Sequence, residues 1–219
     1  MIRLPFRRRS AVASAYRRAK PPLGTTPWRE ASFAVVDLEM TGLDPSRDEI
    51  ISFAAVPVEG GTVVAGGSST AIVRPERMPS AETIRIHGLR PADLAEAPPL
   101  DEVRDLILEA LTGRIVVAHP ARIERQFLSV ALRPAGVRLA EPMICTATLA
   151  GQVLADRVGR RGAETPLSVA VAALGLPMEA PHTADGDALT AAQLFIALAS
   201  RLEWREPQTV GSLVDLSRG

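Results

Sequence analysis

The segment from Ala34 to Gly42, AVVDLEMTG, constrains this chain more than any other stretch. Together with Phe33, its first half is a continuous apolar run, which predicts a strand covered on both faces. Asp37 and Glu39 follow at a spacing of two, so both carboxylates would lie on one face of the strand. Such a pair needs protons or cations for compensation, and oxygen ligands suit Mg²⁺ or Mn²⁺. Taken alone, the pair also fits a solvated strand end.

Charge is distributed unevenly along the 219 residues, although the formal net charge is zero. Residues 1–29 hold eight of the 25 basic residues and no acid, which leaves seventeen basic residues against 25 acidic ones elsewhere. We therefore predict a basic, disordered arm over residues 1–30, whose mobile arginines could contact nucleic-acid phosphates. A folded domain is expected over 31–204 and a short C-terminal tail over 205–219.

The composition also excludes several classes of protein. Cys145 is the single cysteine, which excludes an intramolecular disulfide and fits the reducing cytoplasm, where we expect the protein. No apolar run approaches the ~20 residues that span a bilayer, so no membrane partner is expected. Arginines interrupt any signal-peptide core, although an acid-free, arginine-rich segment also resembles an organellar transit peptide.

Hydrophobic periodicity predicts a mixed α/β arrangement. After the first strand, an apolar strand over 49–58, a Gly60-Gly61 turn and a returning strand over 62–73 would form an antiparallel meander. Short strands are expected over 114–119 and 142–146, and helices over 101–111, 121–132, 148–158, 166–174 and 187–202. The pattern indicates an α/β three-layer domain, with a mixed sheet flanked by helices.

Two further segments place polar residues at the ends of predicted elements. His119 ends the strand over 114–119, and Glu124 lies in the first turn of the next helix. His182 precedes Asp187, which begins the last helix. Each of these has a structural explanation as a packed histidine, a surface acid or a helix-terminal acid. Together with Asp37 and Glu39 they instead predict one acidic cleft.

Together, these motifs resemble those of the DEDDh 3′-5′ exonucleases, which include the proofreading epsilon subunit of bacterial DNA polymerase III, ribonuclease T and oligoribonuclease. Residues 35–45 resemble the first motif of that family and 117–128 the second. Residues 182–188 resemble the third motif, and Ile86-His87-Gly88-Leu89 resembles the connecting His-Gly-Ile segment. The resemblance covers about 33–202 and implies a ribonuclease-H-like fold with a mixed five-stranded sheet.

The resemblance also implies the chemistry of the site. It makes Asp37, Glu39, Glu124 and Asp187 ligands of two Mg²⁺ or Mn²⁺ ions, with His182 as general base. An imidazole titrates near ~6.5 and can accept a proton at neutral pH. By the same similarity, Met40, Thr41, Gly42, His87, Leu89 and His119 would bind the terminal nucleotides, with Leu89 as a wedge.

The activity implied is 3′-5′ exonucleolytic release of nucleoside 5′-monophosphates from nucleic acid, with single-stranded DNA favoured and a DNA polymerase as a possible partner. Two positions depart from the family pattern: Glu124 stands for the usual aspartate, and Pro120 for the usual asparagine. Because Mg²⁺ demands near-ideal geometry, one ion could bind more weakly. The alternatives are an RNA or oligonucleotide exonuclease, and a nucleic-acid-binding domain without turnover.

Overall fold

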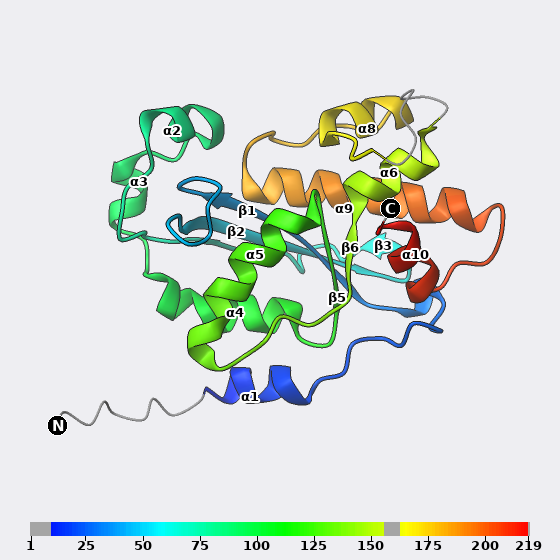
Figure 1. Cartoon of the computed structure of the whole chain (residues 1–219), viewed down its shortest axis with the longest axis horizontal. Coiled ribbons are helices and arrows are strands. Elements are labelled where there is room, and N and C mark those ends of the chain that lie inside the picture. The colour runs from blue at the N-terminus through cyan, green and yellow to red at the C-terminus, as the bar shows by residue number, and fades with distance from the viewer. Residues whose placement is uncertain (1–9, 156–162, 219) are drawn as a thin grey trace.

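The computed structural model describes residues 10–155 and 163–218, which fold around one mixed sheet (Figure 1). The strand order is β3-β2-β1-β5-β6, and β4 also pairs with β2. β1 is central, antiparallel to β2 and parallel to β5, and β5 is parallel to β6. The strands are β1 (Phe33–Met40), β2 (Ile50–Glu59), β3 (Thr62–Val63), β4 (Ser69–Ile72), β5 (Ile115–Ala118) and β6 (Met143–Cys145).

The mixed sheet was expected, but it has six strands where the sequence predicted five. The returning strand expected over 62–73 is broken into β3 and β4, with Gly66 and Gly67 between them. Both pieces pair with β2, since Val63 lies opposite Val58 and Ile72 lies opposite Ser52. Five strand positions are therefore occupied, one of them by two short strands.

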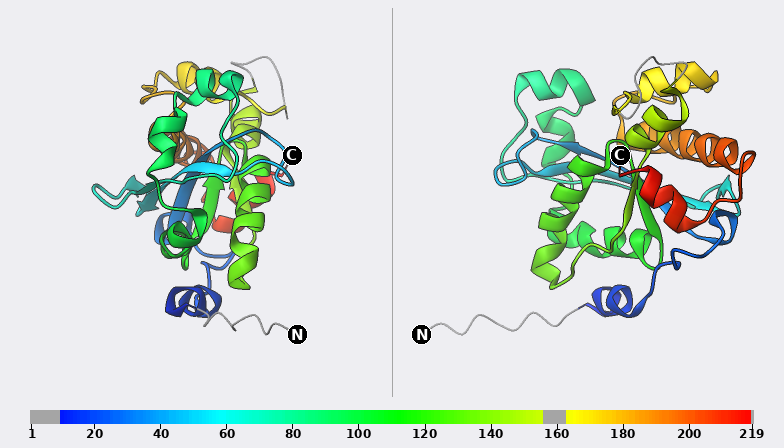
Figure 2. Two further views of the ribbon diagram at one scale, coloured as in Figure 1. Left: turned by 90° about the vertical axis from the view of Figure 1, so that its left-hand side faces the viewer. Right: turned by 45° about the vertical axis from the view of Figure 1, so that its right-hand side comes forward.

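Helices cover both faces of the sheet (Figures 1 and 2). They are α1 (Ala11–Arg18), α2 (Ala81–His87), α3 (Pro91–Ala95), α4 (Leu100–Leu111), α5 (Ala121–Leu132), α6 (Thr146–Val153), α8 (Leu167–Leu174), α9 (Ala184–Glu203) and α10 (Val210–Leu216), with 3-10 turns at Trp28–Glu30 and Arg133–Ala135. The predicted helices are confirmed, except that the one expected over 148–158 starts earlier and ends at Val153, and residues 156–158 lie outside the described part. α1, α2, α3 and α10 were not predicted.

Successive side chains of β1 point to opposite faces of the sheet, where they pack into two apolar cores. The same alternation sets the direction of Asp37 and Glu39. Phe33 and Val35 pack with residues of α9 and α10, whereas Val36 packs with residues of α4 and α5 on the opposite face. Asp37 and Glu39 continue the series of Phe33 and Val35, so they lie on the face covered by α9. Because side chains alternate along β1, both carboxylates face α9, the helix that holds Asp187 in its first turn.

The expectation of a disordered N-terminal arm is wrong for residues 10–30. Trp28 is fully buried, with its ring 6.2 Å from that of Phe195 in an edge-on arrangement and its Nε1 donating to Glu203 at 2.9 Å. Farther upstream, Ala13 and Tyr16 are buried against the core that includes α4. The many arginines led to the prediction of disorder. In the amphipathic helix α1, however, cations occupy only the solvent face, while the opposite face is buried. Residues 1–9 lie outside the described part.

The C-terminal segment is likewise part of the fold and not a tail. Val210, Leu213 and Val214 of α10 are buried in the same core as β1 and α9. The amide of Val210 donates to the carbonyl of Thr26 at 2.9 Å, which joins the two terminal segments. Within 10–155 and 163–218, no helix has the length and apolarity needed to cross a membrane.

Candidate active site

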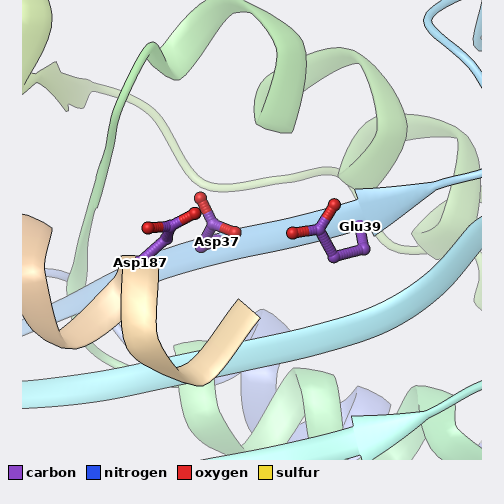
Figure 3. Close-up of side chains that lie close together, drawn as sticks. All are labelled: Asp37, Glu39 and Asp187. Atoms are coloured by element: carbon purple, nitrogen blue, oxygen red, sulfur yellow. The ribbon is translucent and has the colours of Figure 1, made fainter. Parts of the chain in front are cut away.

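Three carboxylates converge where β1 ends and α9 begins (Figure 3). Asp37 and Glu39 come from β1, and Asp187 comes from the first turn of α9. One ligand atom from each can be chosen so that all three atoms lie within 4.8 Å of one another. This acidic cluster joins residues separated by 150 positions in the chain.

Burial makes the charged forms of these acids costly. It raises the pKa of Asp37 well above the ordinary range, and the charges of Glu124, Glu39 and Asp187 raise it further. Burial, and then the charge of Asp187, raises the pKa of Glu39 to about 7. The pKa of Asp187 is also raised by burial, against the opposing hydrogen bond from His182. Without cations, the cluster therefore holds protons that ordinary carboxylates would have lost.

The loop before α9 is tied to Asp187. The amide of His182 donates to Oδ2 of Asp187 at 3.0 Å, while Thr183 caps the helix by accepting from the amide of Gly186 at 3.3 Å. A side chain at Gly186 would collide with the carbonyls of Glu179 and Ala180, so glycine permits the loop to fold back. The side chain of His182 is exposed, and its φ of 63° is left-handed.

Glu124 reaches the same region from α5. It is 4% exposed, and its Oε2 has no hydrogen-bond partner among the described residues. Burial raises the pKa of Glu124 to about 8, the charge of Arg122 lowers it, and those of Glu164 and Glu39 raise it further. Its charge also acts on Asp37. Glu124 therefore belongs to this acidic region, although it lies outside the group of three within 4.8 Å.

His119 is directed to a different partner. Its Nδ1 lies 2.9 Å from Oγ1 of Thr146, and that hydroxyl lies 3.1 Å from the carbonyl oxygen of Ala118. Burial lowers the pKa of His119 to about 4, so the ring is neutral at pH 7. The structure thus joins His119 to the start of α6 and does not place it in the acidic cluster. Thr146 was not predicted as its partner, because only the parallel pairing of β5 and β6 brings the two together.

A cleft of about 410 Å³ opens beside Glu39. His87 and Leu89 line it on the side of α2. The amide of Leu89 donates to Nδ1 of His87 at 3.0 Å, whereas the buried Nε2 has no partner among the described residues. The other wall includes Thr183, Ala184 and Asp185 of the third motif. It also includes residues of β2 and β4 that were not predicted, namely Ser52, Phe53, Thr70, Ala71 and Ile72. β4 reaches the cleft only through its pairing with β2.

Met40 ends β1, and Thr41 and Gly42 follow it in the bend after the strand. Met40 and Gly42 line a second cleft of about 210 Å³. The hydroxyl of Thr41 donates to Oδ1 of Asp48 at 3.2 Å and accepts from the amide of Glu49 at 3.0 Å. A side chain at Gly42 would collide with the Asp48 carboxylate. Within the protein, Gly42 is therefore needed for the close approach of Asp48.

The acidic cluster fits divalent cations by its donor set. It offers only carboxylate oxygens, which suit Mg²⁺ and Mn²⁺. Oδ1 of Asp187 is buried and lacks a hydrogen-bond partner among the described residues, as does Oε2 of Glu124. Cations would satisfy both atoms and compensate the charges that raise the pKa values.

Solved structures of known function define the fold class. Exonuclease X in complex with 5′ overhanging duplex DNA is similar with a TM-score of 0.65 and 24% identity, over 84% of this chain and 99% of its own. E. coli exonuclease I in complex with a dT13 oligonucleotide has a TM-score of 0.67 and 14% identity, over 80% of this chain and 42% of its own. The fold is that of the ribonuclease-H-like exonucleases.

The RNase T exonuclease family model matches residues 34–195. The chain belongs to this family of hydrolases that act on nucleic acid. It is 29% identical to DNA polymerase III subunit epsilon of Aquifex aeolicus, over 79% of this chain and 83% of that protein. It is 33% identical to a DNA polymerase III subunit epsilon-like protein of Rhodobacter capsulatus, over 88% of this chain but only 27% of that protein. With DNA polymerase III PolC-type of Thermotoga maritima, the shared region spans 12% of the relative.

Proposed function

We propose that this chain is a metal-dependent 3′-5′ exonuclease that hydrolyses phosphodiester bonds at the 3′ ends of nucleic acid and releases nucleoside 5′-monophosphates. The observation that carries the proposal is the approach of Asp37, Glu39 and Asp187 to within 4.8 Å on the fold of known exonucleases. DNA is the favoured substrate, because the relatives include a subunit of a DNA polymerase.

In this proposal Asp37, Glu39 and Asp187 hold two Mg²⁺ or Mn²⁺ ions, and Glu124 completes the ligand set. When bound, the cations would supply an activated water and offset charge on the leaving oxygen. The unpartnered Oε2 of Glu124 supports its assignment, since a buried carboxylate oxygen without a partner is costly. A glutamate is one methylene longer than the aspartate of related sites, and this difference matters most for the strict geometry of Mg²⁺.

His182 is proposed as the general base. A ring nitrogen takes a proton as the water oxygen forms its bond to phosphorus, and the bond from phosphorus to the 3′ oxygen breaks. The 3′ oxygen takes a proton from solvent, which leaves a shortened strand and a nucleoside 5′-monophosphate. The contact between the His182 amide and Asp187 supports this role, because it keeps the base beside the carboxylates.

The two clefts beside Glu39 are proposed to receive the terminal nucleotides. His87 and Leu89 would contact the last nucleotide in the larger cleft, and the unpartnered Nε2 of His87 is available for a hydrogen bond. Met40, Thr41 and Gly42 would contact it through their backbone, since the Thr41 hydroxyl is committed to Asp48. His119 would act farther along the strand as a neutral hydrogen-bonding group.

The direct test follows 5′-labelled DNA and RNA oligonucleotides of matched sequence incubated with Mg²⁺, Mn²⁺ or EDTA. We expect metal-dependent ladders that shorten from the 3′ end, faster on DNA. Faster shortening of RNA would favour the RNA exonuclease, and binding without cleavage in either metal would favour the non-catalytic alternative. Asp37→Asn is the control for a contaminating nuclease.

The relatives named as polymerase subunits also make a DNA polymerase the expected partner. Co-migration of the purified chain with the replicative polymerase of the same organism in size-exclusion chromatography would test this. Separate elution of the two at micromolar concentration would contradict a stable complex.

A further inference from the structure

We propose that the outward face of α5 and the segment after it contact the sugar-phosphate backbone of the strand whose 3′ end lies at the acidic cluster. This inference rests on the proposed function and extends it from the reacting end to the upstream nucleotides. The α5 basic surface, as we name it, consists of Arg122, Arg125, Arg133 and Arg138, together with Arg17 of α1.

The residues exposed on α5 form one stripe. Arg122, Arg125 and Gln126 are exposed in the first half, and Arg133 is exposed where the helix ends. Their spacings of three, four and seven keep them on one face of a helix. The opposite face buries Glu124, Phe127, Leu128 and Ala131. The single acid of α5 therefore faces the interior, and its exposed stripe carries only basic and neutral side chains.

This stripe links the candidate active site to α1. α5 starts beside the acidic cluster, where Glu124 acts on Asp37, and its far end reaches α1 (Figure 1). There the guanidinium of Arg17 lies 3.5 Å from the carbonyl oxygens of Ala135 and Gly136. Twelve residues of helix span about 18 Å. A strand stacked as in a duplex covers that distance with about five nucleotides, at ~3.4 Å each.

The surface concentrates positive charge on a chain that is otherwise acidic. Residues 121–140 contain four arginines and one acid, whereas after residue 29 the chain as a whole has more acids than bases. Among the described residues, Arg122, Arg133 and Arg138 have no ion-pair partner within 4.0 Å. Arg125 pairs with Glu141 at 3.3 Å, but both side chains are about half exposed, so the pair contributes little.

Nucleic-acid phosphate is the partner that fits this arrangement. A strand carries regularly spaced negative charges, and its phosphates attract arginines regardless of sequence. The stripe begins where the 3′ end would be hydrolysed, so one strand can occupy the acidic cluster and the basic surface together. An acidic protein surface would also match the charge, but it would not need to begin at the acidic cluster.

The test is the double variant Arg133→Gln/Arg138→Gln, which alters the end of the surface distant from the acidic cluster. Arg201→Gln/Arg205→Gln near the C-terminal end of α9 removes the same charge elsewhere and is the matched control. Binding of a labelled oligothymidylate of about fifteen nucleotides is measured in EDTA at several salt concentrations. We expect roughly tenfold weaker binding at about 0.1 M salt, and a salt slope reduced by ~1.4, for the test variant alone.

Cleavage of a trinucleotide and of the longer oligonucleotide separates this inference from the proposed function. The trinucleotide is too short to reach Arg133, so its kcat/KM should be unchanged, whereas that of the longer substrate should fall roughly tenfold. An unchanged salt slope, or an equal loss in the control variant, would contradict nucleic-acid binding by the α5 basic surface. An acidic protein would then be the partner that matches the charge of this surface. Absence of cleavage by the unmodified chain, with the expected change in slope, overturns the proposed function and supports the surface.

Discussion

The backbone amide of His182 donates a hydrogen bond of 3.0 Å to Oδ2 of Asp187. The bond spans five residues and ties the loop before α9 to a carboxylate in the first turn of that helix. His182 occupies the left-handed region at a φ of 63°, where residues other than glycine are uncommon. The proposed base and a proposed metal ligand are thus parts of one local structure, joined through the backbone of His182.

Asp37→Asn should abolish nuclease activity, since it removes a carboxylate from the cluster at almost constant volume. It should also stabilise the metal-free protein, because it removes a buried acid whose ionisation is unfavourable beside Glu39, Glu124 and Asp187. We expect a higher Tm in EDTA and a smaller rise of Tm on adding Mn²⁺ than in the unmodified chain. Activity in a cleanly purified variant would contradict the metal site.

His182→Asn should lower kcat by about 10²- to 10⁴-fold, the contribution typical of a general base. Asparagine tolerates the left-handed backbone, so the loop and its bond to Asp187 should persist. Oligonucleotide binding in EDTA is the control and should change less than about twofold. A kcat near that of the unmodified chain, with the fold intact, would exclude His182 as the base.

Glu124→Asp should preserve or raise the activity supported by Mg²⁺, because it restores the shorter carboxylate of the family pattern. Glu124→Gln keeps the length but removes the charge, and it should lower activity in both metals. The measurement is kcat/KM in Mg²⁺ and in Mn²⁺. A loss of two orders of magnitude in Glu124→Asp, about 2.7 kcal/mol, would mean that the site is built around the longer side chain.

The metal-free protein should lose stability as the pH rises. Folded Glu124 keeps its proton up to a pKa of about 8 and Glu39 up to about 7, whereas both ionise near 4.5 in an unfolded chain. Between these values the folded state binds more protons than the unfolded state, so the free energy of unfolding falls with increasing pH.

Thermal unfolding in EDTA across this range should show the highest Tm near pH ~5 and a decline toward pH ~9. Glu124→Gln should flatten the decline, because it removes a titrating group. Saturating Mn²⁺ in place of EDTA should also reduce the decline, because the cation stabilises the ionised carboxylates. A Tm that rises between these limits would contradict the raised pKa values.

Trp28→Ala should destabilise the protein by about 3 to 5 kcal/mol, the usual cost of removing a buried aromatic ring. Trp28 is 0% exposed and contacts Phe195 and Glu203, so its loss affects the core behind β1. Denaturant unfolding measures the effect, and Trp204→Ala is the matched control because that ring is 89% exposed. Equal small losses in the two variants would restore the expectation of a dispensable arm.

Local periodicity determined much of the fold before any contact was known. The period of two places Asp37 and Glu39 on one face of β1, and the spacing of apolar residues locates α4, α5 and α9 closely. These features depend on residues near one another in the chain, where backbone geometry alone sets the direction of each side chain.

Only the tertiary structure decided which distant residues meet. Asp187 joins Asp37 because α9 packs across β1, and Thr146 meets His119 because β6 pairs with β5. The burial of Trp28 depends on Phe195 and Glu203, which lie more than 160 residues away. No local pattern encodes such pairings, since they follow from packing free energy shared by the whole chain. Composition therefore suggested a loose arm where the folded chain has a packed segment.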